Sequence, residues 1–146
     1  MHNLTLYAIT KYILMENENI KVFVRKTLGC ECPEKVFEYI ESRHNIKLIN
    51  DILLNNKINI GNTLLIYILE VNDFNFIRSN LSTLLRIGKN ERDRRGFNRF
   101  RLVLVTDKIN EIKQGADRAF KTLTDKDQKI HLHIVNRNEY QGYMDE

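Results

Sequence analysis

Two cysteines one residue apart, Cys30 and Cys32, are the most localised chemical signal in the sequence, and Pro33 follows them directly. Proline is favoured at the first position of a helix, so Cys32 is expected beside a helix start. A thiol there feels the positive end of the peptide dipoles and ionises more readily. The link Cys30-Glu31-Cys32-Pro33 therefore predicts thiol chemistry, with Cys32 as nucleophile and Cys30 as resolving partner. The familiar redox spacing has two intervening residues, and the alternative is a pair of small apolar side chains at a helix junction.

A metal site is a second interpretation of the same cysteines. His131 and His133 lie two residues apart in a segment expected to be a strand, so both imidazoles point to one side of it. With Cys30 and Cys32 they supply two thiolates and two imidazoles, a set that binds zinc. Zinc is the one cofactor these residues suggest. The alternative places both histidines on the polar face of an alternating strand.

Basic residues concentrate in one window, which carries seven cations against two carboxylates although the whole chain has a formal net charge of only +4. The cations are Arg86, Lys89, Arg92, Arg94, Arg95, Arg99 and Arg101. Phe97 and Phe100 lie among them, and nucleic-acid binders use such a mixture of charge and stacking surface. We expect this window to be a loop that meets an anionic partner, either nucleic acid or a phosphorylated ligand. The alternative is a solvated connection, because ligands of α/β sheets usually bind beyond the carboxyl ends of the strands.

Conventional catalytic motifs do not occur in the sequence, so it leaves open whether the protein is an enzyme. It has no Gly-rich phosphate loop, no nucleophile elbow and no His-Glu pair at zinc-protease spacing. Asp107 follows an apolar run at an expected strand end, where enzymes often hold a metal or a catalytic acid. Capping of the next helix is the commoner role for such an aspartate.

The composition indicates a single folded domain over residues 1–146. Hydrophobic residues make up 42% of the chain and charged residues 29%, while one proline and six glycines leave no room for a long disordered linker. Polar residues interrupt the apolar N-terminus, so we expect neither a membrane span nor a signal peptide. Two cysteines do not make a disulfide framework of the secreted kind, which favours a cytoplasmic location.

The elements that position these residues follow from the apolar periodicity. Residues 1–43 are expected to be a helical lead-in, in two pieces divided near residues 16–19, with Gly29 as a left-handed stop and a new helix at Pro33. The segment from 44 to 56 fits both a helix and an alternating strand, and we favour the strand. Gly61-Asn62 is a turn signal before the next apolar run.

Three further runs predict strands, namely Thr63 to Val71, Leu102 to Val105 and Ile130 to Val135. A helix between the first two should begin after Asn72 or Asp73 and close at Gly88, and another should follow Asp107. The sequence therefore predicts an α/β or α+β fold, in which the helical N-terminal third packs on a mixed four-stranded sheet with two crossover helices. The sheet is expected within residues 44–136, with 137–146 as a peripheral tail. A free sheet edge also offers a surface for a homo-oligomer.

Overall fold

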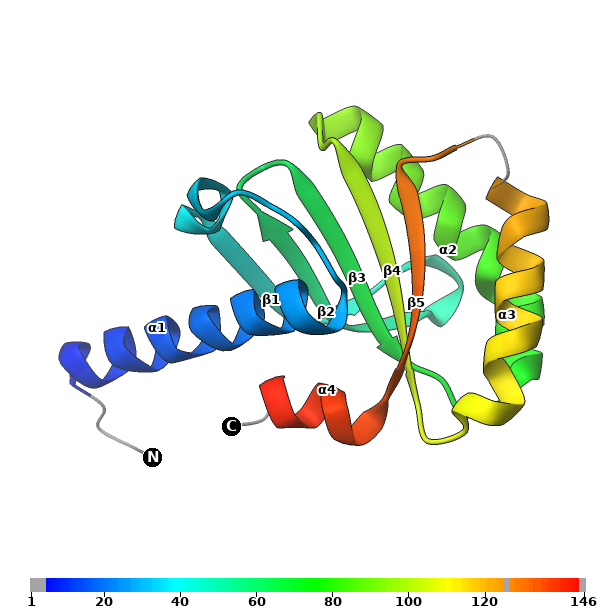
Figure 1. Ribbon diagram of the computed structural model, residues 1–146, viewed down its shortest axis with the longest axis horizontal. Coiled ribbons are helices and arrows are strands. Elements are labelled where there is room, and N and C mark those ends of the chain that lie inside the picture. Colours follow the sequence, from blue (N-terminus) through cyan, green and yellow to red (C-terminus); the bar gives the residue numbers. More distant parts are fainter. Residues whose placement is uncertain (1–4, 125–126, 145–146) are drawn as a thin grey trace.

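The protein folds around a five-stranded mixed sheet with helices on both faces (Figure 1). The computed structural model describes residues 5–124 and 127–144. The strands lie side by side in chain order: β1 (Ile40–Lys47), β2 (Leu53–Ile60), β3 (Leu64–Glu70), β4 (Arg99–Thr106) and β5 (Ile130–Asn136). The first three pair antiparallel, while β4 is parallel to β3 and β5 is parallel to β4. β1 and β5 are therefore the edge strands, and self-pairing through either edge stays a prediction.

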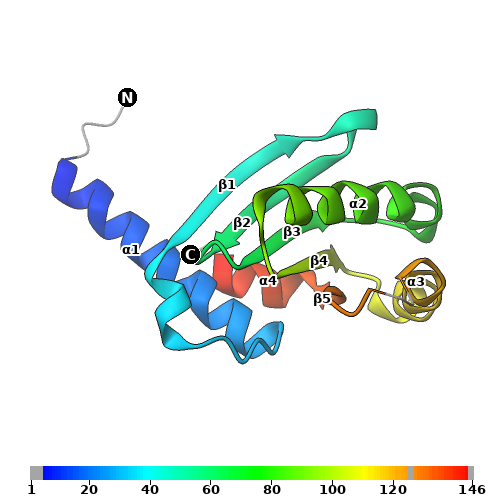
Figure 2. The ribbon, with the colours of Figure 1, turned by 90° about the horizontal axis from the view of Figure 1, so that it is seen from above.

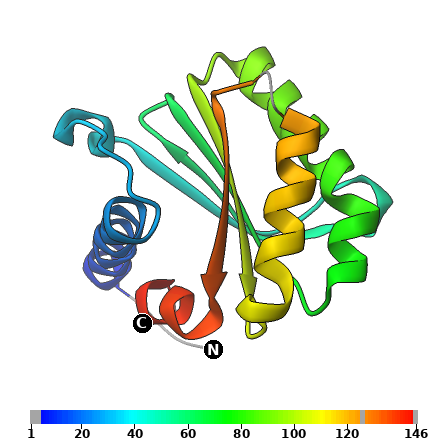
Figure 3. The same ribbon diagram turned by 45° about the vertical axis from the view of Figure 1, so that its right-hand side comes forward.

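Both parallel connections contain a helix, and the two helices cover the same face of the sheet (Figure 3). They are α2 (Phe74–Arg95) between β3 and β4, and α3 (Ile109–Thr124) between β4 and β5. Their apolar sides pack on buried strand residues such as Tyr67, Phe100 and Leu104. The mixed α/β architecture and the two crossover helices agree with the prediction.

The opposite face is covered by the N-terminal helix and the C-terminus. α1 (Leu6–Val22) continues into a short π-helical turn, Phe23–Thr27, and α4 (Arg137–Met144) follows β5 directly. Ile20, Phe23 and Val24 are fully buried against the strands. The amino half of α1 extends past the sheet (Figure 2), and Leu6 and Tyr7 there are exposed.

The N-terminal third differs from the prediction of two helical pieces. α1 runs without a break through residues 16–19, because its buried contacts begin only at Ile20 and polar side chains are tolerated before that point. The expected helix at Pro33 is only a short 3₁₀ turn, Glu34–Glu38, and the chain enters β1 at Ile40. β1 lies at an edge and is partly exposed, so its apolar pattern is weak.

The segment expected to be a single strand from 44 to 56 is instead the end of β1, a tight turn and the start of β2. Asn50 and Asp51 both adopt positive φ in that turn, which lets the chain reverse direction. The sheet therefore has five strands instead of the predicted four. The Gly61-Asn62 turn is confirmed between β2 and β3, and both of its residues have positive φ.

α2 begins as predicted, with the Asp73 side chain capping the Phe76 amide at 3.0 Å, but it does not end at Gly88. It continues to Arg95, and Gly96 in the left-handed conformation ends it (φ 78°). Gly88 has a different role, since a Cβ there would lie 2.1 Å from the buried ring of Phe100. The missing side chain lets α2 approach β4 closely.

The C-terminal segment is not peripheral. In α4 the Tyr140 side chain is only 6% exposed, lies edge-on to Phe23 at 6.1 Å between ring centroids, and donates a hydrogen bond to the buried Asn56. The aromatic side chain therefore joins the core on the α1 face. Across the described ranges, no helix combines the length and the apolar character needed to cross a membrane.

Candidate functional site

A cavity of about 420 Å³ opens at the amino ends of β3 and β4, on the sheet face that α1 covers. Several segments that are distant in sequence line it. They are the link Cys30–Pro33 with the nearby Val36, Thr63 and Leu64 at the start of β3, Asn98 before β4, and Arg99 and Arg101 on β4. The cavity thus brings the cysteine link together with two cations of the basic window.

Strand alternation explains why Arg99 and Arg101 share this face. Phe100 points to the α2 side, where it is fully buried, so its two neighbours point to the opposite side. The parallel register places His131 opposite Arg101 and His133 opposite Val103, which brings both histidines onto the face of the arginines. The predicted i, i+2 pairing of the histidines on one side of a strand is therefore seen in β5.

Each arginine donates to one histidine and to one backbone carbonyl. Arg99 Nη1 lies 3.1 Å from His131 Nε2 and 3.2 Å from the Gln128 oxygen. Arg101 Nη1 lies 2.9 Å from His133 Nε2 and 3.2 Å from the Leu28 oxygen. Since a guanidinium has donors only, each histidine Nε2 must be the acceptor, and both rings are neutral.

The environment keeps these imidazoles neutral. Burial, followed by the charge of Arg101, lowers the pKa of His133 to about 4. The pKa of His131 is lowered in the same way, first by burial and then by Arg101 and Arg99. Neutral acceptors thus hold the guanidiniums in place without cancelling their charge.

The positive charge of this arginine pair is not compensated within the described residues. Neither Arg99 nor Arg101 forms an ion pair with a described carboxylate, and the buried Nε of Arg101 has no hydrogen-bond partner there. Burial and the nearby Arg99 lower the pKa of the Arg101 guanidinium. Half-buried cations held in this way create a site that favours an anion.

The cysteine link also lines the cavity. Cys30 and Cys32 are paired as a disulfide, with Cα atoms 5.3 Å apart, and both residues are half-buried. Two contacts fix their backbone: the Cys30 amide donates to the Val24 oxygen at 3.1 Å, and Arg25 Nη2 donates to the Cys32 oxygen at 3.2 Å. No long helix begins at Pro33, so the expected helix dipole at Cys32 is reduced to a single 3₁₀ turn.

The four residues predicted to bind zinc do not form a zinc site in this structure. The two sulfurs are bonded to each other, and Arg99 and Arg101 occupy the Nε2 atoms of the two histidines. Over the described ranges, no three side chains of the metal-binding types His, Cys, Asp and Glu gather where they could hold one ion.

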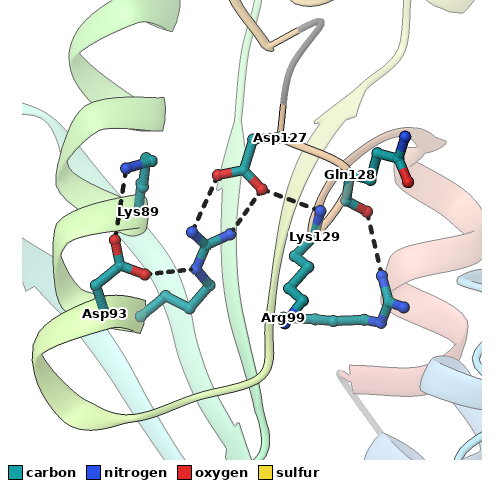
Figure 4. Close-up of polar contacts among 7 residues, drawn as sticks. Lys89, Asp93, Arg99, Asp127, Gln128 and Lys129 are labelled. Atoms are coloured by element: carbon teal, nitrogen blue, oxygen red, sulfur yellow. Dashed lines mark hydrogen bonds and ion pairs between the residues drawn. The ribbon is translucent and has the colours of Figure 1, made fainter.

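The basic window is not the loop that we expected, because it comprises the last turns of α2 and the start of β4. Arg92 is nearly buried and makes a two-pronged contact with Asp127, both distances being 3.0 Å, and a third contact with Asp93 at 3.0 Å. Figure 4 shows Lys89 beside Asp93, and Arg99 on the Gln128 carbonyl, away from these carboxylates.

The remaining cations of the window divide into paired and exposed groups. Arg95 binds the buried Glu91 at 2.7 Å, and Lys57 reaches the same carboxylate at 2.6 Å. Burial alone would raise the pKa of Glu91, but hydrogen bonds from Lys57, Tyr67 and Arg95 lower it. Arg86 and Arg94 are exposed on the surface of α2. Only Arg99 and Arg101 line the cavity beside the cysteines.

The carboxyl ends of the parallel strands, the usual ligand position in such sheets, hold a compensated cluster. Arg137 forms ion pairs with both Glu70 and Asp107, and these contacts raise its pKa. The Asp107 carboxylate therefore has a cationic partner, and the Thr106 hydroxyl accepts from the Lys108 amide at 3.0 Å just before α3.

No family model, curated protein or solved structure matches this chain. Sequence reasoning had identified Cys30, Cys32, Arg99 and Arg101 but had not placed them together, and it missed Thr63 and Asn98 entirely. The alternation in Arg99-Phe100-Arg101 is the signal that would have extended the predicted strand back from Leu102 and paired the arginines with the histidines of β5.

Proposed function

We propose that the protein is a binding module that holds the phosphate group of a small phosphorylated ligand in the cavity between β4 and the cysteine link. The observation that carries this proposal is the anchoring of Arg99 and Arg101 by neutral acceptors, His131, His133 and backbone carbonyls. An arginine with a structural role commonly forms an ion pair with a carboxylate, which neutralises its charge. These two keep their charge for an anion.

Phosphate chemistry suits this arrangement. The planar guanidinium presents several donors in a fork that matches phosphate oxygens, and two such groups face the cavity from one strand. Thr63 and Asn98 also line the cavity, and their side chains are of types that can donate further hydrogen bonds. A volume of about 420 Å³ is in the range of small-ligand pockets.

The other cations of the window favour a small ligand over a nucleic acid. Lys89, Arg92 and Arg95 are bound to carboxylates, and the exposed Arg86 and Arg94 are eight residues apart on one helix. Nucleic-acid binding requires several free cations along one surface, so that many phosphates are neutralised together. Arg99 and Arg101 are instead the cations of this window that lie together in a concave site without a carboxylate partner among the described residues.

The test is calorimetric titration of inorganic phosphate and of glycerol phosphate at low ionic strength. Wild type should bind both, and Arg101→Gln should weaken binding about tenfold because it removes a charge-assisted contact. Arg94→Gln is the matched control and should leave the affinity unchanged. Glu31→Gln should tighten binding about twofold, because it removes a carboxylate from the cavity wall.

Two results would contradict the proposal. One is no heat of binding at about 10 mM phosphate. The other is an equal loss of affinity in the Arg101→Gln and Arg94→Gln proteins, which would indicate general surface attraction. Tight, steeply salt-dependent binding of a single-stranded oligonucleotide that Arg101→Gln does not weaken would favour a nucleic-acid interface in its place.

A further inference from the structure

We infer that Cys30 and Cys32 form a reversible disulfide that exchanges with small anionic thiols entering the arginine-lined cavity. This activity goes beyond phosphate binding, although it uses the same positive charge. It rests on three features of the described residues: both cysteines line the cavity, their backbone is fixed by contacts that do not involve sulfur, and two uncompensated arginines line the same space.

Access is the first requirement for exchange. A thiolate must approach a sulfur atom, and a disulfide enclosed in a core resists attack. Here both cysteines are half-buried and line an open cavity of about 420 Å³, while the other side of the link packs against the core that contains Phe23 and Val24. The cavity thus gives a small thiol a route to the sulfurs from one side.

Reversibility follows from how the link is held. The Cys30 amide bonds to Val24 and the Cys32 carbonyl bonds to Arg25, while Arg101 holds the Leu28 carbonyl just before the link. Gly29 with φ of 67° makes the turn between these anchors. None of these contacts depends on the sulfur–sulfur bond, so the reduced cysteines stay close and are ready to form it again.

The exchange balances with two equivalents of thiol. A thiolate of the incoming molecule attacks one cysteine sulfur, the disulfide breaks, and its electron pair leaves on the other cysteine as a thiolate. A second thiolate then attacks the external sulfur of the mixed disulfide, which releases the first cysteine and the oxidised small molecule. The protein gains two electrons and two protons, and two thiols become one external disulfide.

The arginines provide selectivity for anionic thiols. Arg99 and Arg101 raise the local concentration of negatively charged molecules and stabilise the cysteine thiolate that leaves. Glu31 opposes this attraction from the same wall, but it is exposed to solvent, whereas Arg101 is half-buried. A thiol that carries a carboxylate should therefore react faster than a neutral thiol of similar size.

The test compares reduction of the folded protein by 3-mercaptopropionate and by 2-mercaptoethanol at equal thiolate concentration and low salt. The number of alkylated cysteines is followed over time by mass spectrometry. The anionic thiol should react about fivefold faster in wild type. The ratio should fall toward one in Arg101→Gln, which retains Arg99, and stay unchanged in the matched control Arg94→Gln. Addition of the oxidised small thiol should restore the disulfide.

Two outcomes overturn the inference: a disulfide that is reduced only when the protein unfolds, or equal rates for the two thiols in wild type. These readouts do not depend on phosphate. A protein that exchanges selectively but binds no phosphate keeps this inference and loses the proposed function, whereas a protein that binds phosphate but has an inert disulfide does the reverse. When both hold, phosphate slows the anionic thiol more than the neutral one.

Discussion

Two groups of arginines lie on either side of the Gly96 turn and have opposite surroundings. Arg92, at the end of α2, is held by the carboxylates of Asp127 and Asp93 at 3.0 Å. Arg101, at the start of β4, is held by a neutral imidazole and a carbonyl. We propose from this difference that the charge of the acceptor decides whether an arginine serves the fold or is available to a ligand.

The pKa values of the Arg92 and Arg101 guanidiniums shift in opposite directions, which agrees with their different hydrogen-bond acceptors. Hydrogen bonding to Asp127 and then to Asp93 raises the pKa of Arg92 although burial opposes it. Burial and the charge of Arg99 lower the pKa of Arg101. Carboxylates within the fold stabilise the positive charge of Arg92, whereas the charge of Arg101 has no carboxylate partner among the described residues.

The largest expected effect is a difference in the free energy of unfolding between variants of Arg92 and Arg101. Arg92→Gln should lower the free energy of unfolding by about 2 kcal/mol, because it removes a two-pronged contact and leaves Asp127 without its partner. Arg101→Gln should cost less than about 1 kcal/mol, because the lost hydrogen bonds are offset by the removal of a desolvated charge. Urea denaturation of the two variants measures the difference. Equal losses would show that the Arg101 site is as structural as the Arg92 site.

A smaller effect concerns pH and arises at His133, which holds the cavity residue Arg101. Folding keeps His133 neutral by lowering its pKa from 6.5 to about 4, so the unfolded chain binds a proton first as pH falls. The stabilisation is complete above pH 6.5 and is lost between pH 6.5 and 4. Between pH 7 and 5 this histidine should account for about 1 kcal/mol of lost stability, after allowance for its partial exposure.

His133→Gln tests this assignment, because glutamine keeps an acceptor for Arg101 and does not titrate. The loss of unfolding free energy between pH 7 and 5 should become smaller by about 1 kcal/mol in the variant. A pH dependence equal to that of wild type would show that the imidazole is not held neutral beside the arginine.

The sequence was informative where apolar runs are continuous. Strand β3 agrees with its predicted position, because burial on both faces leaves a long stretch of Leu and Ile, and α2 begins at its predicted Asp73 cap. For β4 only the apolar part was predicted, since the strand begins three residues before Leu102. The edge strand β1 was missed, since only part of one side is buried. We expected Gly88 to end α2, but the helix continues past it. The buried ring of Phe100 on β4 leaves no room for a side chain at this position.

The candidate site was identified in fragments. Residue type and spacing indicated the cysteine link, the basic window and the histidine pair separately, because each is local in sequence. Their meeting depends on the register between β4 and β5 and on the turn at Gly29, which are tertiary features. Likewise, the two-pronged partner of Arg92 could not be predicted locally, since Asp127 lies 35 residues from Arg92 along the chain.

The central claim is that anions bind at Arg99 and Arg101 and not at the paired cations of α2. The most direct measurement is a phosphate titration of nitrogen-15-labelled protein, followed through the arginine Nε–H resonances by NMR. We expect saturable shifts for Arg101 and Arg99, with the buried Arg101 Nε shifting most, and little change at Arg92. Shifts that are confined to the exposed Arg86 and Arg94, or that are equal for all arginines, would contradict it.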